Sequence, residues 1–276
     1  GSCSAFGSSK RRRISGQADE AAGAESPSCG PGLEVCVTPW SAWSAGALDF
    51  LRDFVSLRRP LLLRGSGARL PGEGPWSREA LVERAGNSQV EVNTIPYGED
   101  FGCHDSTLPT TLARFLDVEL DLFAASGAPF YLFTFVDEES QPLLAELVRE
   151  ELHGLPDRLP VPFERLRASA LQFAVGGAGS GSPAHFHDDA VNILLAGRKR
   201  WRLWPPARAA MSRIHPSRLM GGAPAADDDV DLEGSVEVVQ EVGEALYVPS
   251  GWGHAVLNEA PHTVCVAVEL SSAAAA

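Results

Sequence analysis

The sequence predicts a mainly β protein whose core is a sandwich or a barrel. From Leu166 onward, short alternating or apolar runs are separated by turns rich in Gly and Pro, which is typical of those architectures. The composition, 44% hydrophobic and 21% charged, is that of a globular chain. The strands predicted in this part are residues 170–175, 184–195, 199–204, 236–242, 245–248 and 262–270.

The part before Leu166 is predicted to contain both helices and strands. Apolar residues between Leu48 and Val55 recur at helical spacing, which predicts a helix within 43–57. We therefore expect this part to decorate the β core with helices. Its other predicted helices are 112–122 and 143–152, and its predicted strands are 61–63, 89–95 and 130–136.

The first 32 residues differ from the rest of the chain. Eighteen of them are Gly, Ser or Ala, so the segment buries too little apolar surface to offset its ordering entropy, and we expect a disordered tail. We interpret its basic run, residues 10–13, as a solvated charge cluster in preference to a nuclear address. The expected organisation is a tail (1–32), one domain (33–271) with an N-terminal part (33–167) and a β core (168–271), and a short tail (272–276).

The formal net charge of −13 limits the classes of partner. Binding to nucleic-acid backbones requires clustered positive charge that displaces counterions, so general nucleic-acid binding is not expected. An acidic surface suits a protein or peptide partner with basic residues, and it also serves solubility. No run of 18 apolar residues occurs, so no membrane span is expected.

The five cysteines are scattered and form no C-x-x-C pair. Neither a zinc ribbon nor a disulfide framework is therefore predicted. A reduced compartment is the simplest interpretation, with one or two disulfides left open. The chain does not begin with Met and shows no signal peptide, so the compartment is not assigned.

Three of the seven histidines have informative spacing. His185 and His187 are at positions i and i+2 of a predicted strand, which would place both imidazoles on one face. His254 follows a Gly-rich turn about seventy residues later. Two histidines near each other and a third from a distant strand are how a jelly roll builds a metal site. The alternative is that each histidine is an ordinary hydrogen-bonded residue, as we expect for the other four.

Lys199 has an unexpected place in its strand. In the run from Arg198 to Leu203, the arginines share one face, and Lys199, Trp201 and Leu203 share the other. A lysine on an apolar face requires an anionic partner, because an unpaired buried ammonium is costly. That partner is either a bound anion or a carboxylate of the protein, unless the aliphatic stem carries the ammonium outward.

Two longer motifs carry a family resemblance. Gly243-x5-Pro249-x-Gly251-x2-His254-x3-Asn258 matches the second cupin motif, and Gly179-x5-His185-x-His187 matches the start of the first. The Glu that should follow in the first motif is absent, and Asn192 lies nearby instead. Ser182-Pro183-Ala184-His185, the run from Gly197 to Pro206 and Ile214-His215-Pro216 resemble the Jumonji-C (JmjC) domain.

The resemblance implies a double-stranded β-helix, the cupin-like jelly roll. JmjC proteins hold Fe(II) with His-x-Asp or His-x-Glu and a distal His, bind 2-oxoglutarate and O2, and hydroxylate or demethylate protein side chains. By this resemblance, His185 and His254 match two of the three Fe(II) ligands, and His187 takes the position of the carboxylate ligand. Asp189, on the same side of the predicted strand as His187, is an alternative ligand or a supporting residue.

The resemblance also implies a co-substrate site. Lys199 matches the residue that grips the distal carboxylate of 2-oxoglutarate, and Ser182 and Asn192 are expected to contact the same molecule. The alternative for Ser182 is a turn residue before Pro183. No catalytic residue beyond the metal ligands is predicted. The family includes a secretory-pathway relative, so that pathway and a soluble intracellular location both stay open.

Two functions follow from these residues. The first is a non-haem Fe(II)- and 2-oxoglutarate-dependent oxygenase that acts on a peptide or a small molecule. The second is a non-catalytic, metal-binding scaffold or interaction module, because a third neutral ligand in place of a carboxylate changes the charge and redox balance of iron. Whether the chain is an enzyme is therefore left open, with another divalent transition metal as the alternative to iron.

Overall fold

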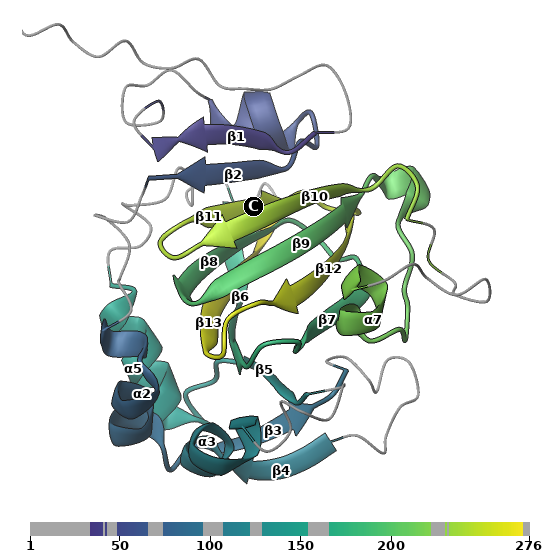
Figure 1. Cartoon of the computed structure of the whole chain (residues 1–276). Coiled ribbons are helices and arrows are strands. Elements are labelled where there is room, and N and C mark those ends of the chain that lie inside the picture. Colours follow the sequence, from purple (N-terminus) through teal and green to yellow (C-terminus); the bar gives the residue numbers. More distant parts are fainter. Residues whose placement is uncertain are drawn as a thin grey trace, which may run out of the picture.

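The computed structural model describes residues 34–40, 42, 49–65, 74–95, 107–121, 129–153, 166–221, 230 and 232–272. The predicted tail 1–32, with its basic run, lies outside the described residues, as does 273–276. The described part is built on two facing β-sheets (Figure 1).

Residues 166–272 form a double-stranded β-helix. Its strands alternate between a larger sheet, which includes the order β11-β8-β13-β6, and a smaller sheet of order β10-β9-β12-β7. Neighbouring strands of this core are antiparallel. The predicted jelly roll is therefore confirmed. The strands are β6 Leu166–Gly176, β7 Gly181–His185, β8 Ala190–Ala196, β9 Arg198–Trp204, β10 Val236–Glu241, β11 Ala245–Val248, β12 Gly253–Asn258 and β13 Thr263–Ser272.

The N-terminal part adds strands to both edges of the larger sheet. β1 (Cys36–Pro39) and β2 (Leu61–Arg64) are parallel and join it beside β11. β5 (Tyr131–Phe135), β3 (Gln89–Asn93) and β4 (Thr107–Thr111) join it beside β6. This part is thus more than a helical decoration, because it extends the sheet to nine strands in the order β1-β2-β11-β8-β13-β6-β5-β3-β4.

Three helices of the N-terminal part, α2 (Arg78–Ala85), α3 (Leu112–Arg114) and α5 (Pro142–Glu151), lie beside β3–β5 (Figure 1). Two of them begin at a side-chain cap: Ser77 Oγ accepts from Ala80 N at 3.2 Å, and Thr111 Oγ1 accepts from Arg114 N at 3.2 Å. The helical segments of the N-terminal part are η1 Leu51–Val55, η2 Gly74–Trp76, α2 Arg78–Ala85, α3 Leu112–Arg114, η5 Phe115–Glu119 and α5 Pro142–Glu151. Two more, η6 Pro206–Arg208 and α7 Pro216–Gly221, lie between β9 and β10.

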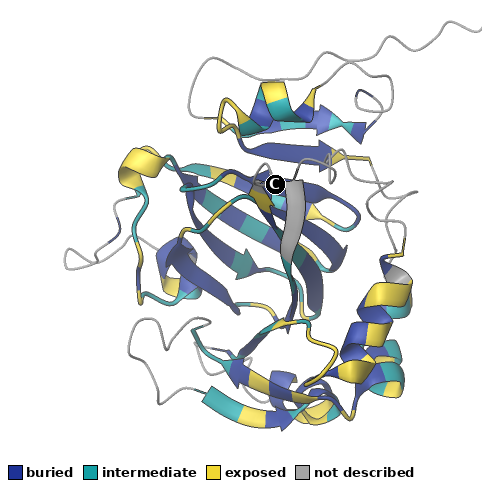
Figure 2. Cartoon of the chain, turned by 180° about the vertical axis from the view of Figure 1, so that it is seen from behind, coloured by how far each residue is buried: buried dark blue, intermediate teal, exposed yellow. Residues whose placement is uncertain are grey.

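The two faces of the larger sheet have different neighbours. On one face, side chains such as Phe173 and Val266 pack with helical residues such as Leu81 and Leu147 in the main apolar core. The strands are mostly buried, and exposed residues concentrate on the helices and loops (Figure 2). The alternate residues of these strands face the smaller sheet and enclose the interior of the barrel.

One sequence expectation is wrong in detail. The single strand predicted over 184–195 is two strands, β7 and β8, which belong to different sheets and are joined by residues 186–189. The Gly-rich turn expected before His254 is present and leads into β12, the strand that carries His254. Among the cysteines, Cys36 is disulfide-bonded, which is the possibility that the sequence left open, and Cys265 is a free, buried thiol.

Candidate metal centre

Three histidines meet at one end of the barrel. His185 is the last residue of β7, His254 lies opposite it on β12, and His187 lies in the 186–189 loop. Their potential ligand nitrogens all lie within 4.8 Å of one another. The ring centroids are 4.2 Å apart for His185 and His254, 4.7 Å for His187 and His254, and 5.5 Å for His185 and His187.

The hydrogen bonds of these rings determine which nitrogen faces the cluster. Nδ1 of His185 donates to Pro183 O at 2.8 Å, and Nδ1 of His254 donates to Trp252 O at 3.1 Å. Nδ1 of His187 donates to its neighbour's carbonyl, Asp188 O, at 2.6 Å. A carbonyl only accepts, so each Nδ1 carries the proton and each Nε2 keeps its lone pair, as a metal ligand requires.

Burial keeps two of these imidazoles neutral. Burial, together with the smaller effect of the neighbouring His187, lowers the pKa of His185 to about 4. The same causes, burial first, hold the pKa of His254 well below its usual value. At neutral pH both rings are therefore uncharged and able to bind a cation.

The 186–189 loop is held by bonds from three segments of the chain. Asp189 Oδ1 accepts from Tyr247 Oη at 2.6 Å and from Ser250 N at 3.0 Å, and Asp189 O accepts from Leu270 N at 2.7 Å. His187 O accepts from Gly251 N at 2.9 Å. Asp189 thus supports the loop and is not part of the histidine cluster. Its expected position beside His187 on one strand face is wrong because this segment is a loop.

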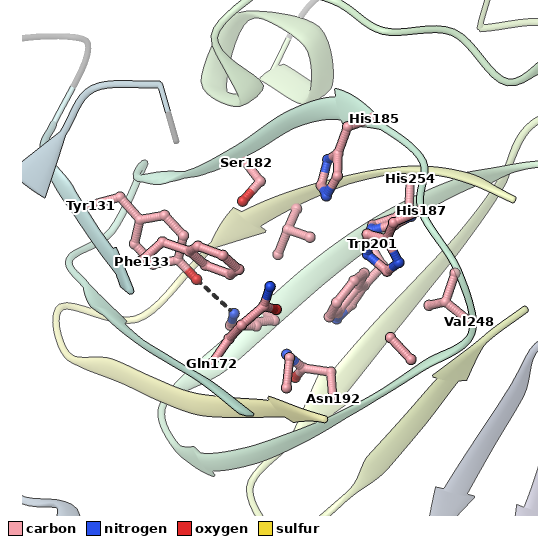
Figure 3. A pocket seen from close by; sticks show the side chains of 14 residues that line it. Tyr131, Phe133, Gln172, Ser182, His185, His187, Asn192, Trp201, Val248 and His254 are labelled. Carbon is pink, nitrogen blue, oxygen red and sulfur yellow. Dashed lines mark hydrogen bonds between the residues drawn. The ribbon is translucent and has the colours of Figure 1, made fainter. Parts of the chain in front are cut away.

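A cavity extends from the histidines into the barrel. Figure 3 shows His185, His187 and His254 at one side of it, and Tyr131 and Phe133 at the other. None of its described lining residues is acidic. They are Tyr131, Phe133, Gln172, Ser182, His185, His187, Ala190, Asn192, Lys199, Trp201, Val248, His254, Val256 and Ala267.

Lys199 faces this cavity from β9, as its strand pattern predicts, and is only 2% exposed. Its Nζ donates to Tyr131 Oη at 3.0 Å and to Cys265 Sγ at 2.8 Å. Within the described residues it forms no ion pair, so the protein carboxylate considered as its partner is not found there. The ammonium is a buried positive charge beside a cavity without acidic groups.

The other two expected co-substrate residues line the same cavity. Ser182 on β7 is 4% exposed, and Asn192 on β8 is 6% exposed. Asn192 Nδ2 donates to Cys265 Sγ at 3.3 Å, and its buried Oδ1 has no hydrogen-bond partner among the described residues. Such an orphaned polar atom is typical of a site that receives a polar ligand.

Sequence reasoning missed two residues of the site, Tyr131 and Cys265. Tyr131 belongs to a strand that the sequence identified only as buried and aromatic, and Cys265 to a strand identified only as apolar. Both approach Lys199 from positions 66 or more residues away in the chain. No local signal could have found them, because pairing between distant strands creates these contacts.

The donor set fits a divalent transition metal. Three neutral imidazoles suit Fe(II), Zn(II), Cu(II) or Ni(II), whereas Ca(II) and Mg(II) prefer oxygen ligands. Because no ligand is anionic, a bound ion would keep its two positive charges, and Lys199 adds a third at the other side of the cavity. The cavity is therefore electrostatically suited to a small dianion.

The fold and the histidine cluster together define a cupin-type barrel with a candidate metal site. A family profile described as a cupin-like domain matches residues 47–270, and the chain belongs to this family. Its resemblance to the JmjC group is confirmed by the following relatives.

The chain is 34% identical over 111 residues to JmjC domain-containing protein 8 of Mus musculus (36% of this chain, 37% of the relative). It is 27% identical over 233 residues to arginine-specific demethylase JMJ22 of Arabidopsis thaliana (76% and 41%). It is 31% identical over 105 residues to the human 2-oxoglutarate and iron-dependent oxygenase JMJD4 (30% and 22%). The matched segments thus span less than half of each relative.

Proposed function

We propose that this chain is a JmjC-type Fe(II)- and 2-oxoglutarate-dependent oxygenase that acts on a protein side chain. The observation that carries the proposal is a single cavity with three inward-facing imidazoles at one side and the Lys199 ammonium buried in its wall. The described lining of this cavity has no carboxylate. Neither a metal ion held by the three imidazoles nor the Lys199 ammonium would therefore be neutralised from within the cavity.

Each residue has a distinct role in the proposal. His185, His187 and His254 hold Fe(II), which supplies O2 activation when it is bound. Lys199 Nζ exchanges its contact with Cys265 for a carboxylate of 2-oxoglutarate, and Tyr131 Oη supports the ammonium. Ser182 and Asn192 orient the same co-substrate from β7 and β8. Trp201, beside His254, and Phe133, beside Tyr131, add apolar surface to the cavity wall.

A basic protein side chain is the substrate class that the charge of the chain favours. The formal net charge is −13, which attracts arginine- and lysine-rich segments. The name of the Arabidopsis relative specifies an arginine substrate. No described helix is both long and apolar enough to cross a membrane.

His187 supports a second candidate function, a metal-binding scaffold without turnover. It supplies a neutral ring where the family pattern has a carboxylate. The missing negative charge leaves the metal site one unit more positive and shifts the redox balance of the metal. The same cavity would then hold a metal and an anion for structural or interaction purposes.

The two functions are separated by anaerobic reconstitution with Fe(II), followed by assays of bound iron, 2-oxoglutarate binding and succinate release in air. We expect one iron per chain and succinate release that depends on 2-oxoglutarate and rises with basic peptides. Iron binding without succinate release would support the scaffold. Absence of bound iron, Zn(II) and Cu(II) would contradict the metal site itself.

Two variants sharpen this experiment. His187→Asp restores the carboxylate, and uncoupled succinate release that appears only in this variant would identify His187 as the cause of inactivity. His153→Ala is the matched control, because His153 is exposed and lies outside the cluster. It should bind iron as the unmodified chain does, whereas His254→Ala should lose at least tenfold in affinity.

A further inference from the structure

A lysine and a cysteine are in direct contact between the two sheets. Lys199 Nζ lies 2.8 Å from Cys265 Sγ, and the two residues are 2% and 1% exposed. Lys199 projects from β9 of the smaller sheet and Cys265 from β13 of the larger one. A thiol and a lysine nitrogen, which is nucleophilic once its ammonium has released a proton, are thus held together in the interior.

The surroundings preserve this contact. Asn192 Nδ2 donates to Sγ at 3.3 Å, and Tyr131 Oη accepts from Nζ at 3.0 Å. Cys265 is a free thiol, and none of the described carboxylates pairs with Lys199. Cys265 itself is not among the described residues that line the cavity, but Lys199 and Asn192, which both donate to its Sγ, do line it. The cavity has a volume of about 40 Å³ and admits water-sized molecules, so a small peroxide would approach the thiol past these two side chains.

We propose that Lys199 and Cys265 form a redox-sensitive crosslink when the protein meets hydrogen peroxide. In the first step Sγ attacks one peroxide oxygen, the S–O bond forms as the O–O bond breaks, and water leaves with the thiol proton. The product is a sulfenic acid, the first and reversible stage of cysteine oxidation.

In the second step the nitrogen replaces the oxygen. Nζ, after releasing one proton to solvent, attacks Sγ, so that an N–S bond forms and the S–O bond breaks. The departing hydroxide takes the remaining proton and leaves as water. Sulfur is oxidised by two electrons, one peroxide is reduced to two waters, and no other reagent is consumed. A thiol reductant restores both side chains.

The crosslink has two structural consequences. It ties β9 to β13 and so joins the two sheets covalently. It also removes the positive charge of Lys199 from the cavity. This second consequence is regulatory only if Lys199 anchors the co-substrate, and to that extent it rests on the proposed function, whereas the bond itself does not.

The test is peptide mapping by mass spectrometry of the metal-free chain after treatment with hydrogen peroxide. We expect a peptide pair that contains Lys199 and Cys265, is lighter than the sum of its parts by two hydrogen atoms, and disappears with dithiothreitol. Lys199 is one of only two lysines in the chain, so its peptides are unambiguous.

The unmodified chain supplies its own control. Peroxide added after unfolding in urea should oxidise Cys265 without the crosslink, because the contact exists only in the folded state. Cys265→Ser and Lys199→Arg should each abolish the pair. Oxidation of folded Cys265 to the sulfinic acid, with the Lys199 peptide unchanged, would overturn the proposal.

A binding measurement separates this inference from the proposed function. The crosslinked chain should bind 2-oxoglutarate at least tenfold more weakly than the untreated chain and recover with dithiothreitol. Unchanged affinity in fully crosslinked protein would overturn the role of Lys199 as co-substrate anchor and leave the crosslink established.

Discussion

Asp189 shows how a single residue outside the metal cluster determines its geometry. Its carboxylate accepts from Tyr247 and Ser250, and its carbonyl accepts from Leu270, so β11, β13 and the turn before β12 all hold the 186–189 loop. Burial, together with the bond to Asp189, raises the pKa of Tyr247, which keeps this phenol a hydrogen-bond donor at any physiological pH. The position of the loop histidine, His187, depends on these bonds.

We therefore predict that Asp189→Ala lowers metal affinity by roughly 10–100-fold, the effect typical of residues that orient ligands. Titration with Co(II), which is stable in air, measures the change. Asp188→Ala is the matched control, because its carboxylate accepts from Ser250 Oγ at 3.2 Å on the surface. Equal losses in the two variants would argue against the supporting role of Asp189.

At the scale of elements, the turn from β8 to β9 connects the two sheets and places Lys199. Gly197 has a φ of +81°, and a Cβ there would lie 2.4 Å from His262 O and 2.6 Å from Thr263 Oγ1. Gly65 has a φ of +72°, and a Cβ added there would meet no described atom within 4 Å. The two glycines share a left-handed backbone and differ in the space around it.

We predict that Gly197→Ala reduces the free energy of unfolding by roughly 2–4 kcal/mol and Gly65→Ala by about 1 kcal/mol. The first combines backbone strain with a clash against β13, whereas the second carries the backbone cost alone. Urea denaturation of both variants measures the difference. Equal losses would show that the close approach to His262 is relieved by a small movement.

At the scale of the whole molecule, buried neutral histidines make stability depend on pH. Burial lowers the pKa of His215 to about 4, and His215 lies outside the metal cluster. Protons bind the unfolded chain more readily between pH 6.5 and 4, so this residue's contribution is complete above pH 6.5 and is lost as the pH falls toward 4.

We predict that lowering the pH from 7 to 5 costs on the order of 1–2 kcal/mol through His215 alone. His215→Gln should therefore flatten the curve of unfolding free energy against pH over this range. Metal-free protein is used so that metal release does not contribute, and His185 and His254, whose pKa values are also lowered, contribute equally to the curves of the variant and of the unmodified chain. An unchanged curve would show that His215 remains partly protonated in the folded chain.

The main apolar core also bears on the domain organisation of the chain. A single apolar core contains residues of β2, α2, α5, β6 and β13 and so links the N-terminal part to the barrel. This continuity supports the proposal that residues 33–271 are one domain. The strand added beside β6, β5, places Tyr131 against Lys199 of β9.

The sequence by itself determined the jelly roll, the histidine set and the inward direction of Lys199. These features rest on local periodicity and on motif spacing, which each segment carries independently of its partners. Only the tertiary structure decided that His187 lies on a loop, that Asp189 holds this loop, and that Cys265 and Tyr131 meet Lys199. Those contacts join residues 58 to 81 positions apart, and pairing between strands, which no local pattern encodes, brings them together.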